Sequence, residues 1–234
     1  MSEAHKLFSP QDIAQMIDIS AVRADSADKK IEEVVKRAKT YGCYLVTILP
    51  SQTLRAKRLL TNCSMPKIGG NVGFPSGGQT TKVKVVETRE LIEIGVDEID
   101  MVIDIAAHLS GRYDDVYNDM LAVIDAAEGR PVKTILECHY LNSDQIKQGC
   151  DLAIKAGAAF VKTGTGWALT GATLENVELI KQHVGDQIKI KASGGIRNIE
   201  MLIDMYSRGA TRFGISLGSA SKILDSAATL RYPI

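Results

Sequence analysis

The sequence lacks several features that mark common classes of protein. Its 234 residues carry 28 basic and 28 acidic side chains, so the formal net charge is zero. Proteins that bind nucleic acids or anionic membrane surfaces usually carry a basic excess, which is missing here. No apolar run approaches the roughly 18 residues that a membrane span needs. We therefore expect neither a nucleic acid nor a membrane as a partner.

Cysteine and histidine are scarce and scattered. The four cysteines are widely spaced, with no C-x-x-C pair, and the four histidines show no metal-ligand spacing. This pattern favours small buried thiols in a reducing compartment over a disulfide framework or a zinc site. The first eight residues do not show the basic and then apolar segments of a secretory signal. We therefore expect a cytoplasmic protein without metal or other cofactor.

Short runs rich in valine and isoleucine recur along the whole chain. Each is a few residues long and is bounded by glycine, proline or polar residues, as buried parallel strands are. The predicted strands are residues 15–20, 43–49, 67–74, 98–105, 132–138, 159–163, 188–193 and 212–217.

Amphipathic helical patterns lie between these runs, with apolar residues at a 3.6-residue period and charge on the other face. The pattern over 143–156 opens at Ser143, a predicted N-cap, and breaks at Gly157. Thr173 is a second predicted N-cap. The delimited helices are residues 28–41, 82–94, 115–127, 143–156, 173–183, 198–207 and 219–227.

The alternation predicts eight strands and eight helices, with one unit every 30 residues or so. Strict alternation implies parallel strands joined by helical crossovers, and a single α/β barrel takes about 200–250 residues. We predict one domain over residues 1–234, a closed (β/α)₈ barrel. An open doubly wound sheet is the alternative, although no G-x-G-x-x-G motif follows the first strand.

Ionisable residues occupy positions in five of the predicted strands where an inward side chain is expected. In such barrels the chemistry lies at the carboxyl ends of the strands, and buried charges are costly unless paired. Strands shorter than predicted would instead place these charges in solvent. We favour a functional cluster for Lys162, Lys191 and Asp100, whereas Lys133 and Lys189 are equally well explained as ion-pair partners. The set comprises Asp18, Asp100, Lys133, Glu137, Lys162, Lys189 and Lys191.

Two neighbouring lysines point to imine chemistry. A free lysine has a pKa of about 10.4, and only its neutral amine attacks a carbonyl. A second cation and partial desolvation lower that pKa and so activate the nucleophile. We therefore predict Lys162 as the nucleophile, Lys191 as its activating neighbour and Asp100 as the proton carrier. The resulting iminium draws electrons from an adjacent carbon–carbon bond and allows it to break.

Glycines follow the last predicted strands, where barrels commonly hold a phosphate on backbone N–H groups and a helix N-terminus. Gly164 adds a further close-approach position, and Arg197 is either a supplement or a solvated surface residue. The candidate phosphate-binding residues are Gly166, Gly194, Gly195, Gly214 and Ser216. The glycine- and proline-containing loop 73–78 either forms a wall of the mouth or simply reverses the chain.

Four motifs in order along the chain resemble the deoxyribose-phosphate aldolase family. They are FVKTGTG around Lys162, IKASGGIR around Lys191, DEIDMVIDIAAHLSG around Asp100 and NVGFPSGGQTTKVKVVET at 71–88. The resemblance implies a metal-independent class I aldolase on a (β/α)₈ barrel, acting in nucleoside catabolism. Its expected partners are 2-deoxy-D-ribose 5-phosphate, acetaldehyde and D-glyceraldehyde 3-phosphate. It also implies the same roles for Lys162, Lys191 and Asp100, with Asp18 and Lys133 in support.

The chain departs from the family pattern near the expected substrate. Thr47 stands where a cysteine is usual, Trp167 replaces a phenylalanine or lysine, and Leu217 replaces a serine. We count Thr47 among the supporting residues. The alternatives are a related lysine-dependent aldolase for another sugar and a non-catalytic sugar-phosphate-binding barrel. The resemblance also implies a homodimer formed through outer helices, and we expect the tail 231–234 to be frayed.

Overall fold

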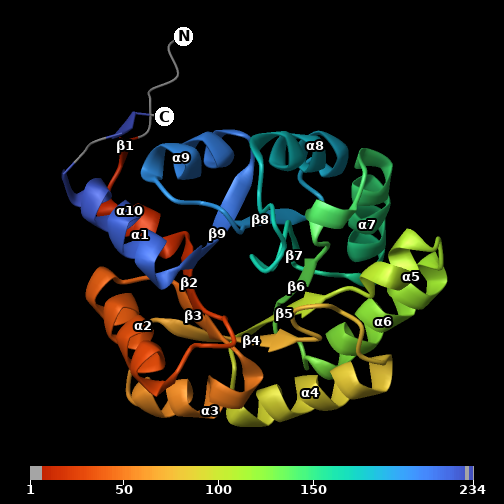
Figure 1. Cartoon of the computed structure of the whole chain (residues 1–234), viewed down its shortest axis with the longest axis horizontal. Helices are drawn as coiled ribbons and strands as arrows, with labels where there is room; N and C mark the ends of the chain where they lie inside the picture. The colour runs from red at the N-terminus through yellow and green to blue at the C-terminus, as the bar shows by residue number, and fades with distance from the viewer. Residues whose placement is uncertain (1–6, 230–231, 234) are drawn as a thin grey trace.

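Eight parallel strands close into a barrel in the computed structural model, which describes residues 7–229 and 232–233. The strands follow chain order, and the last pairs with the first, so Ile17 lies opposite Phe213. Figure 1 shows the strands at the centre with the helices around them. The prediction of a (β/α)₈ barrel is confirmed, and the open sheet is wrong. The barrel strands are β2 (Ile17–Ala21), β3 (Leu45–Ile48), β4 (Lys67–Val72), β5 (Glu98–Val102), β6 (Val132–Ile135), β7 (Phe160–Lys162), β8 (Lys189–Ser193) and β9 (Ala210–Ser216).

The helices surround the barrel. Each of the seven helices whose ends were predicted from the sequence is present, and its ends differ from the prediction by at most two residues. The sequence pattern does not delimit α3, although Pro50 stands in its first turn, where a fixed φ suits a helix. The short helices α1 and α5 are additional to the eight helices that the predicted strand–helix alternation requires. The helices are α1 (Pro10–Gln15), α2 (Asp28–Tyr41), α3 (Pro50–Leu59), α4 (Thr81–Ile94), α5 (Ile105–Leu109), α6 (Tyr113–Ala126), α7 (Ser143–Ala156), α8 (Leu174–Val184), α9 (Ile199–Ser207) and α10 (Leu217–Thr229), with a 3₁₀ turn η1 (Cys138–Tyr140).

One predicted helix cap is wrong by a residue. The side chain of Asn142, rather than Ser143, accepts the Gln145 N–H, and the Gln145 side chain accepts the Asn142 N–H in return. This reciprocal capping box satisfies two backbone donors, which places Ser143 in the first turn. The other cap is confirmed, because the Thr173 side chain accepts the N–H of Asn176.

Two predicted strands differ from the structure in ways that change where their charges lie. β6 ends at Ile135, and Glu137 adopts a left-handed backbone conformation with φ 55°, so it does not share a face with Lys133. Lys189 stands at the start of β8 and is exposed, with its ammonium 5.7 Å from the centre of the Phe160 ring. The expected burial of Lys189 is therefore wrong, although the register of β8 on β7 keeps it in the same alternation as Lys191.

Part of the tail is paired rather than frayed. β1 (Leu7–Phe8) and β10 (Tyr232–Pro233) form a two-stranded antiparallel sheet outside the barrel (Figure 1). The remaining tail residues, 231 and 234, lie outside the described residues. All four cysteines are free thiols; three are buried as expected, but Cys63 is exposed. Among the described helices, none combines the length and apolar character that a membrane crossing requires.

A buried ion pair ties two outer helices to the barrel. Lys84 of α4 is fully buried, and its ammonium donates to Asp119 Oδ2 of α6 at 2.5 Å. The same nitrogen donates to the Val102 carbonyl at 3.0 Å, and Thr81 Oγ1 donates to Asp119 Oδ1 at 2.9 Å. Both carboxylate oxygens of Asp119 thus accept hydrogen bonds from α4.

We expect Asp119→Ala to lower the free energy of unfolding by roughly 3–5 kcal/mol, because it leaves the Lys84 ammonium buried and unpaired. Urea denaturation followed by circular dichroism measures the change. The matched control is Asp115→Ala on the same helix, which breaks only the exposed pair with Arg112. That control should cost less than about 1 kcal/mol. Equal losses in the two variants would contradict the proposed importance of the buried pair.

Candidate active site

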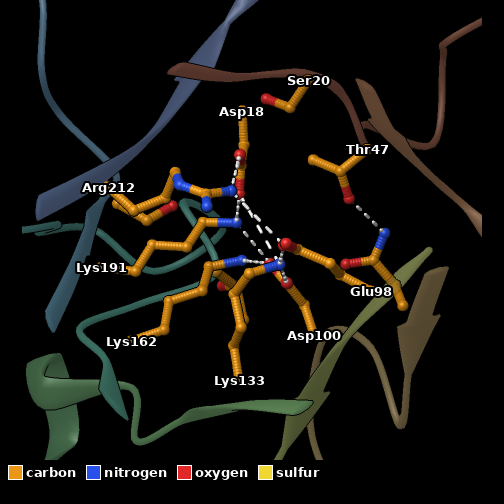
Figure 2. A network of polar contacts seen from close by, with 12 residues as sticks. Asp18, Ser20, Thr47, Glu98, Asp100, Lys133, Lys162, Lys191 and Arg212 are labelled. Carbon is orange, nitrogen blue, oxygen red and sulfur yellow. Dashed lines mark hydrogen bonds and ion pairs between the residues drawn. The ribbon is translucent and has the colours of Figure 1, made fainter. Parts of the chain in front are cut away.

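Seven ionisable side chains converge inside the barrel (Figure 2). Each is almost entirely removed from water, and together they form one continuous network of ion pairs. The members are Asp18 on β2, Glu98 and Asp100 on β5, Lys133 on β6, Lys162 on β7, Lys191 on β8 and Arg212 on β9.

Asp100 is the centre of this network. Its Oδ2 atom accepts from Lys162 Nζ and from Lys191 Nζ, each at 2.7 Å, and its Oδ1 accepts from Lys133 Nζ at 2.8 Å. Because both lysine nitrogens contact one oxygen, they lie no further apart than twice 2.7 Å. One carboxylate therefore holds three lysine nitrogens within hydrogen-bond distance.

Strand register explains the convergence. Lys162 of β7 is the register partner of Lys191 of β8, and Asp100 of β5 is the partner of Lys133 of β6. Partners on adjacent parallel strands present their side chains to the same side of the sheet. The inward face therefore places one basic–basic pair and one acidic–basic pair close together.

Two members of the network were not among the sequence-predicted residues. Arg212 donates to Asp18 Oδ1 at 2.9 Å and approaches Glu98 Oε2 at 3.4 Å. Glu98 also lies 2.7 Å from Lys133, and the Arg212 guanidinium stacks 3.7 Å from the Tyr44 ring centre. Both residues stand early in their strands, and a search directed at strand ends passes over them. Their inward period-two position is the signal that could have found them.

The network holds four basic and three acidic groups, so one cation lacks a matching anion. Burial lowers the pKa of Lys162 to about 8; Asp100 opposes this shift and the nearby Lys191 cation adds to it. Burial acts in the same direction on Lys133, but the carboxylates of Asp100, Asp18 and Glu98 outweigh it and raise that pKa. Of Lys162 and Lys133, Lys162 is therefore the amine that more readily becomes neutral.

The carboxylates stay ionised for the converse reason. Burial raises the pKa of Asp100, yet Lys133, Lys162 and Lys191 together hold it well below its ordinary value. The pKa of Asp18 is also lowered, against the effect of burial, by Lys191, Lys133 and Arg212. Asp100 can therefore accept a proton from a bound group without itself carrying one at rest.

Two other sequence-predicted residues lie apart from this network. Thr47 is buried, and its hydroxyl accepts from Asn71 Nδ2 at 3.0 Å (Figure 2). Glu137 accepts from the N–H of Thr165 at 3.2 Å and from the Thr165 hydroxyl, which ties the loop after β6 to the loop after β7. A Cβ at Gly164 would lie 2.7 Å from Glu137 Oε1, so a larger residue there would displace the Glu137 carboxylate. Burial raises the pKa of Glu137.

A cavity of about 330 Å³ opens at the carboxyl ends of β2, β7, β8 and β9. All five candidate phosphate-binding residues line it, together with Arg197 and the first residues of α10. Gly171, which the sequence reasoning missed, packs against this loop: a Cβ there would lie 2.2 Å from the carbonyl carbon of Gly194. The N–H of Ala172 also donates to the Gly194 carbonyl at 2.9 Å.

A second cavity of about 460 Å³ lies over the ends of β4 to β7. Pro75 and Ser76 line it, and Phe74 packs edge-on against Trp167 with ring centres 6.2 Å apart. The loop 73–78 therefore forms a wall of the mouth, which is one of the two alternatives that the sequence left open. Across residues 7–229 and 232–233, no three His, Cys, Asp or Glu side chains are grouped so as to hold a metal ion.

A closed barrel with a lysine–carboxylate cluster inside and a cavity at the strand ends is typical of barrel enzymes. Similarity to known proteins identifies which family of barrel enzymes this is. The model of the DeoC/LacD family aldolases matches residues 13–221. The chain belongs to this family, and it is an aldolase, a carbon–carbon lyase.

Similar proteins and solved structures carry names that agree with this family. The deoxyribose-phosphate aldolase of Klebsiella pneumoniae is 43% identical over 213 residues, which cover 90% of this chain and 86% of the relative. A structure described as a putative deoxyribose-phosphate aldolase from Coccidioides immitis superposes with a TM-score of 0.88 at 33% identity, over 95% of this chain and 88% of its own. The tetrameric deoxyribose phosphate aldolase of Aeropyrum pernix superposes with a TM-score of 0.85 at 29% identity. The match covers 93% of this chain and 92% of the relative.

We expect the Lys162 amine to titrate at about pH 8, because it is buried beside another cation. Competitive acetylation with acetic anhydride from pH 6 to 11, analysed peptide by peptide by mass spectrometry, measures this. Lys162 should be an ammonium and unreactive below this midpoint, and reactive above it. A midpoint near the ordinary lysine value of about 10.4 would show that the cluster does not depress its pKa.

Proposed function

We propose that this aldolase reversibly cleaves 2-deoxy-D-ribose 5-phosphate into acetaldehyde and D-glyceraldehyde 3-phosphate. The observation that carries the proposal is the Lys162 amine, which has a pKa of about 8 and lies 2.7 Å from Asp100. The relatives described as deoxyribose-phosphate aldolases, at 38–43% identity, support the choice of substrate.

Lys162 is the nucleophile of this reaction. Its neutral amine adds to the C1 aldehyde of the open-chain sugar, and the carbinolamine loses water to give an iminium. The C3 hydroxyl then gives up its proton, the C2–C3 bond breaks, and its electron pair moves into the iminium. This step releases glyceraldehyde 3-phosphate and leaves an enamine. Protonation at C2 and hydrolysis release acetaldehyde and restore the Lys162 amine.

Asp100 carries protons to and from these intermediates. It is ionised at rest and already accepts a hydrogen bond from Lys162 Nζ, so it can take the proton that the amine loses on attack. Lys191 raises the share of neutral Lys162 through its charge. Lys133 and Asp18 support both residues: Lys133 binds the other oxygen of Asp100, and Asp18 binds Lys191 at 2.5 Å.

The phosphate occupies the cavity of about 330 Å³. Backbone N–H groups at its glycines and the N-terminus of α10 favour an anion there. The proposed ligands are Gly166, Gly194, Gly195, Gly214 and Ser216. An aldolase for another sugar is the second candidate, because the buried side chain of Leu217 lines the same cavity in place of a polar group.

We also propose that the chain works as a single catalytic domain in the cytoplasm and associates with itself through outer helices as a homodimer. The relative from Aeropyrum pernix, described as a tetramer, supports self-association. Sedimentation or mass photometry of the purified protein measures the number of copies.

We expect Lys162→Ala to abolish cleavage of 2-deoxyribose 5-phosphate, by at least roughly 1,000-fold in kcat, because no imine can form. Borohydride should trap a stable adduct on Lys162 of the native protein incubated with that sugar, and none on the variant. An adduct without turnover of this sugar supports the second candidate. An unmodified Lys162 with every aldehyde and sugar phosphate tested would falsify the imine mechanism.

We expect Lys191→Met to move the pH midpoint of imine formation upward by about one unit. The variant removes the cation that disfavours protonated Lys162, and it leaves the opposing Asp100 charge in place. The rate of borohydride-trapped adduct formation with acetaldehyde, followed from pH 6 to 10, gives the midpoint, and circular dichroism checks the fold. An unchanged midpoint in a folded variant would remove Lys191 from this role.

A further inference from the structure

Trp167 forms a brace across the mouth of the barrel. It belongs to the loop after β7, and its indole Nε1–H donates to the carbonyl of Val22, after β2, at 2.9 Å. Its backbone N–H donates to Thr165 Oγ1 at 3.0 Å, and its ring meets the edge of Phe74. The residue is therefore held at three points. It lines the second cavity, whereas Arg23 and Gly166 beside it line the first.

Arg23 lies on this brace. Its guanidinium carbon is 4.6 Å from the centre of the Trp167 ring, and Arg23 follows directly after the residue that the indole N–H binds. Among the described residues the structure gives Arg23 no ion pair with a carboxylate. The side chain is exposed, and the ring face is the surface that orients it.

The cavity that Arg23 lines has a one-sided charge. Arg23, Lys30 and Arg197 line it, and no acidic residue does so among the described part of the chain. The glycine N–H groups of this cavity supply hydrogen bonds but no full positive charge, whereas a phosphate monoester is close to a dianion at neutral pH. A guanidinium offers paired N–H donors that match two phosphate oxygens, and an aromatic face restricts its orientation before binding.

We propose that Arg23, positioned by Trp167, is the residue that selects phosphorylated over unphosphorylated sugars in this aldolase. This inference rests on the proposed function and specifies how the same site recognises the anionic end of its substrate. It also gives Trp167 a role: the residue that departs from the family pattern serves as the platform for a cation on the opposite loop. Arg23 is a ligand of the phosphate, and Trp167 is a positioning residue.

The test is the ratio of kcat/KM for 2-deoxyribose 5-phosphate to that for 2-deoxyribose. We expect Arg23→Gln to lower this ratio roughly 10- to 100-fold, with the loss in KM for the phosphorylated sugar, because a charge-assisted hydrogen bond is removed. Lys29→Gln is the matched control: it removes an exposed cation beside Lys30 that does not line the cavity, and its ratio should stay within about twofold. An unchanged ratio for Arg23→Gln overturns the proposal, as does a parallel loss with both sugars.

The platform is tested separately. Trp167→Ala should lower the ratio much as Arg23→Gln does, and the double variant should be no worse than Arg23→Gln alone, because the two side chains act as one unit. Trp167→Phe keeps an aromatic ring but loses the hydrogen bond to the Val22 carbonyl. Its ratio should lie between those of the native protein and Trp167→Ala. Fully additive losses in the double variant would overturn the positioning role of Trp167.

The proposal can also be separated from the proposed function. If the native protein forms no Lys162 adduct and turns over neither sugar, the proposed function fails. Titration calorimetry with inorganic phosphate then tests Arg23 by itself. Binding that weakens roughly tenfold or more in Arg23→Gln supports the assignment, whereas equal binding by both proteins overturns it.

Discussion

The interaction on which the site depends is the sharing of one carboxylate, Asp100, by three lysine nitrogens. Inside a barrel a lone ammonium would be too costly to bury, so every cation needs an anion close by. Asp18 and Glu98 complete the set, but three carboxylates cannot balance four basic groups. The imbalance falls on Lys162, whose contacts include only one carboxylate among the described residues. The same contacts that allow these charges to be buried thus also set the pKa of Lys162.

The sequence predicted the barrel well because strands and helices alternate regularly and the strands are short runs rich in valine and isoleucine. It also brought out Lys162, Lys191 and Asp100, since a charge within an apolar strand is costly unless it is paired inside the fold. It could not show how charges pair across the barrel. Asp18 and Arg212 are 194 residues apart, and only the closure of β9 onto β2 makes them neighbours. The same holds for Gly171, whose need for glycine arises from contact with another loop.

Two cavities give the mouth of the barrel a polar half and an apolar half. The half over β7 to β2 carries glycines and cations, and the half over β4 to β7 is lined largely by apolar side chains such as Ile105 and Leu109. Thr165 lines both cavities and bonds to Glu137, so the loop that follows Lys162 is fixed from each side. The two cavities therefore present different chemistry on the two sides of the loop that follows Lys162.

The small sheet formed by β1 and β10 has a consequence for how the chain can be rearranged. Residues 7–8 and 232–233 run side by side in opposite directions, outside the barrel and away from the ionised interior (Figure 1). A linker of a few residues could join these segments without crossing the mouth. New termini could then be opened in an exposed loop elsewhere. Such a circular permutant would keep every strand pairing of the barrel while its order of synthesis changed.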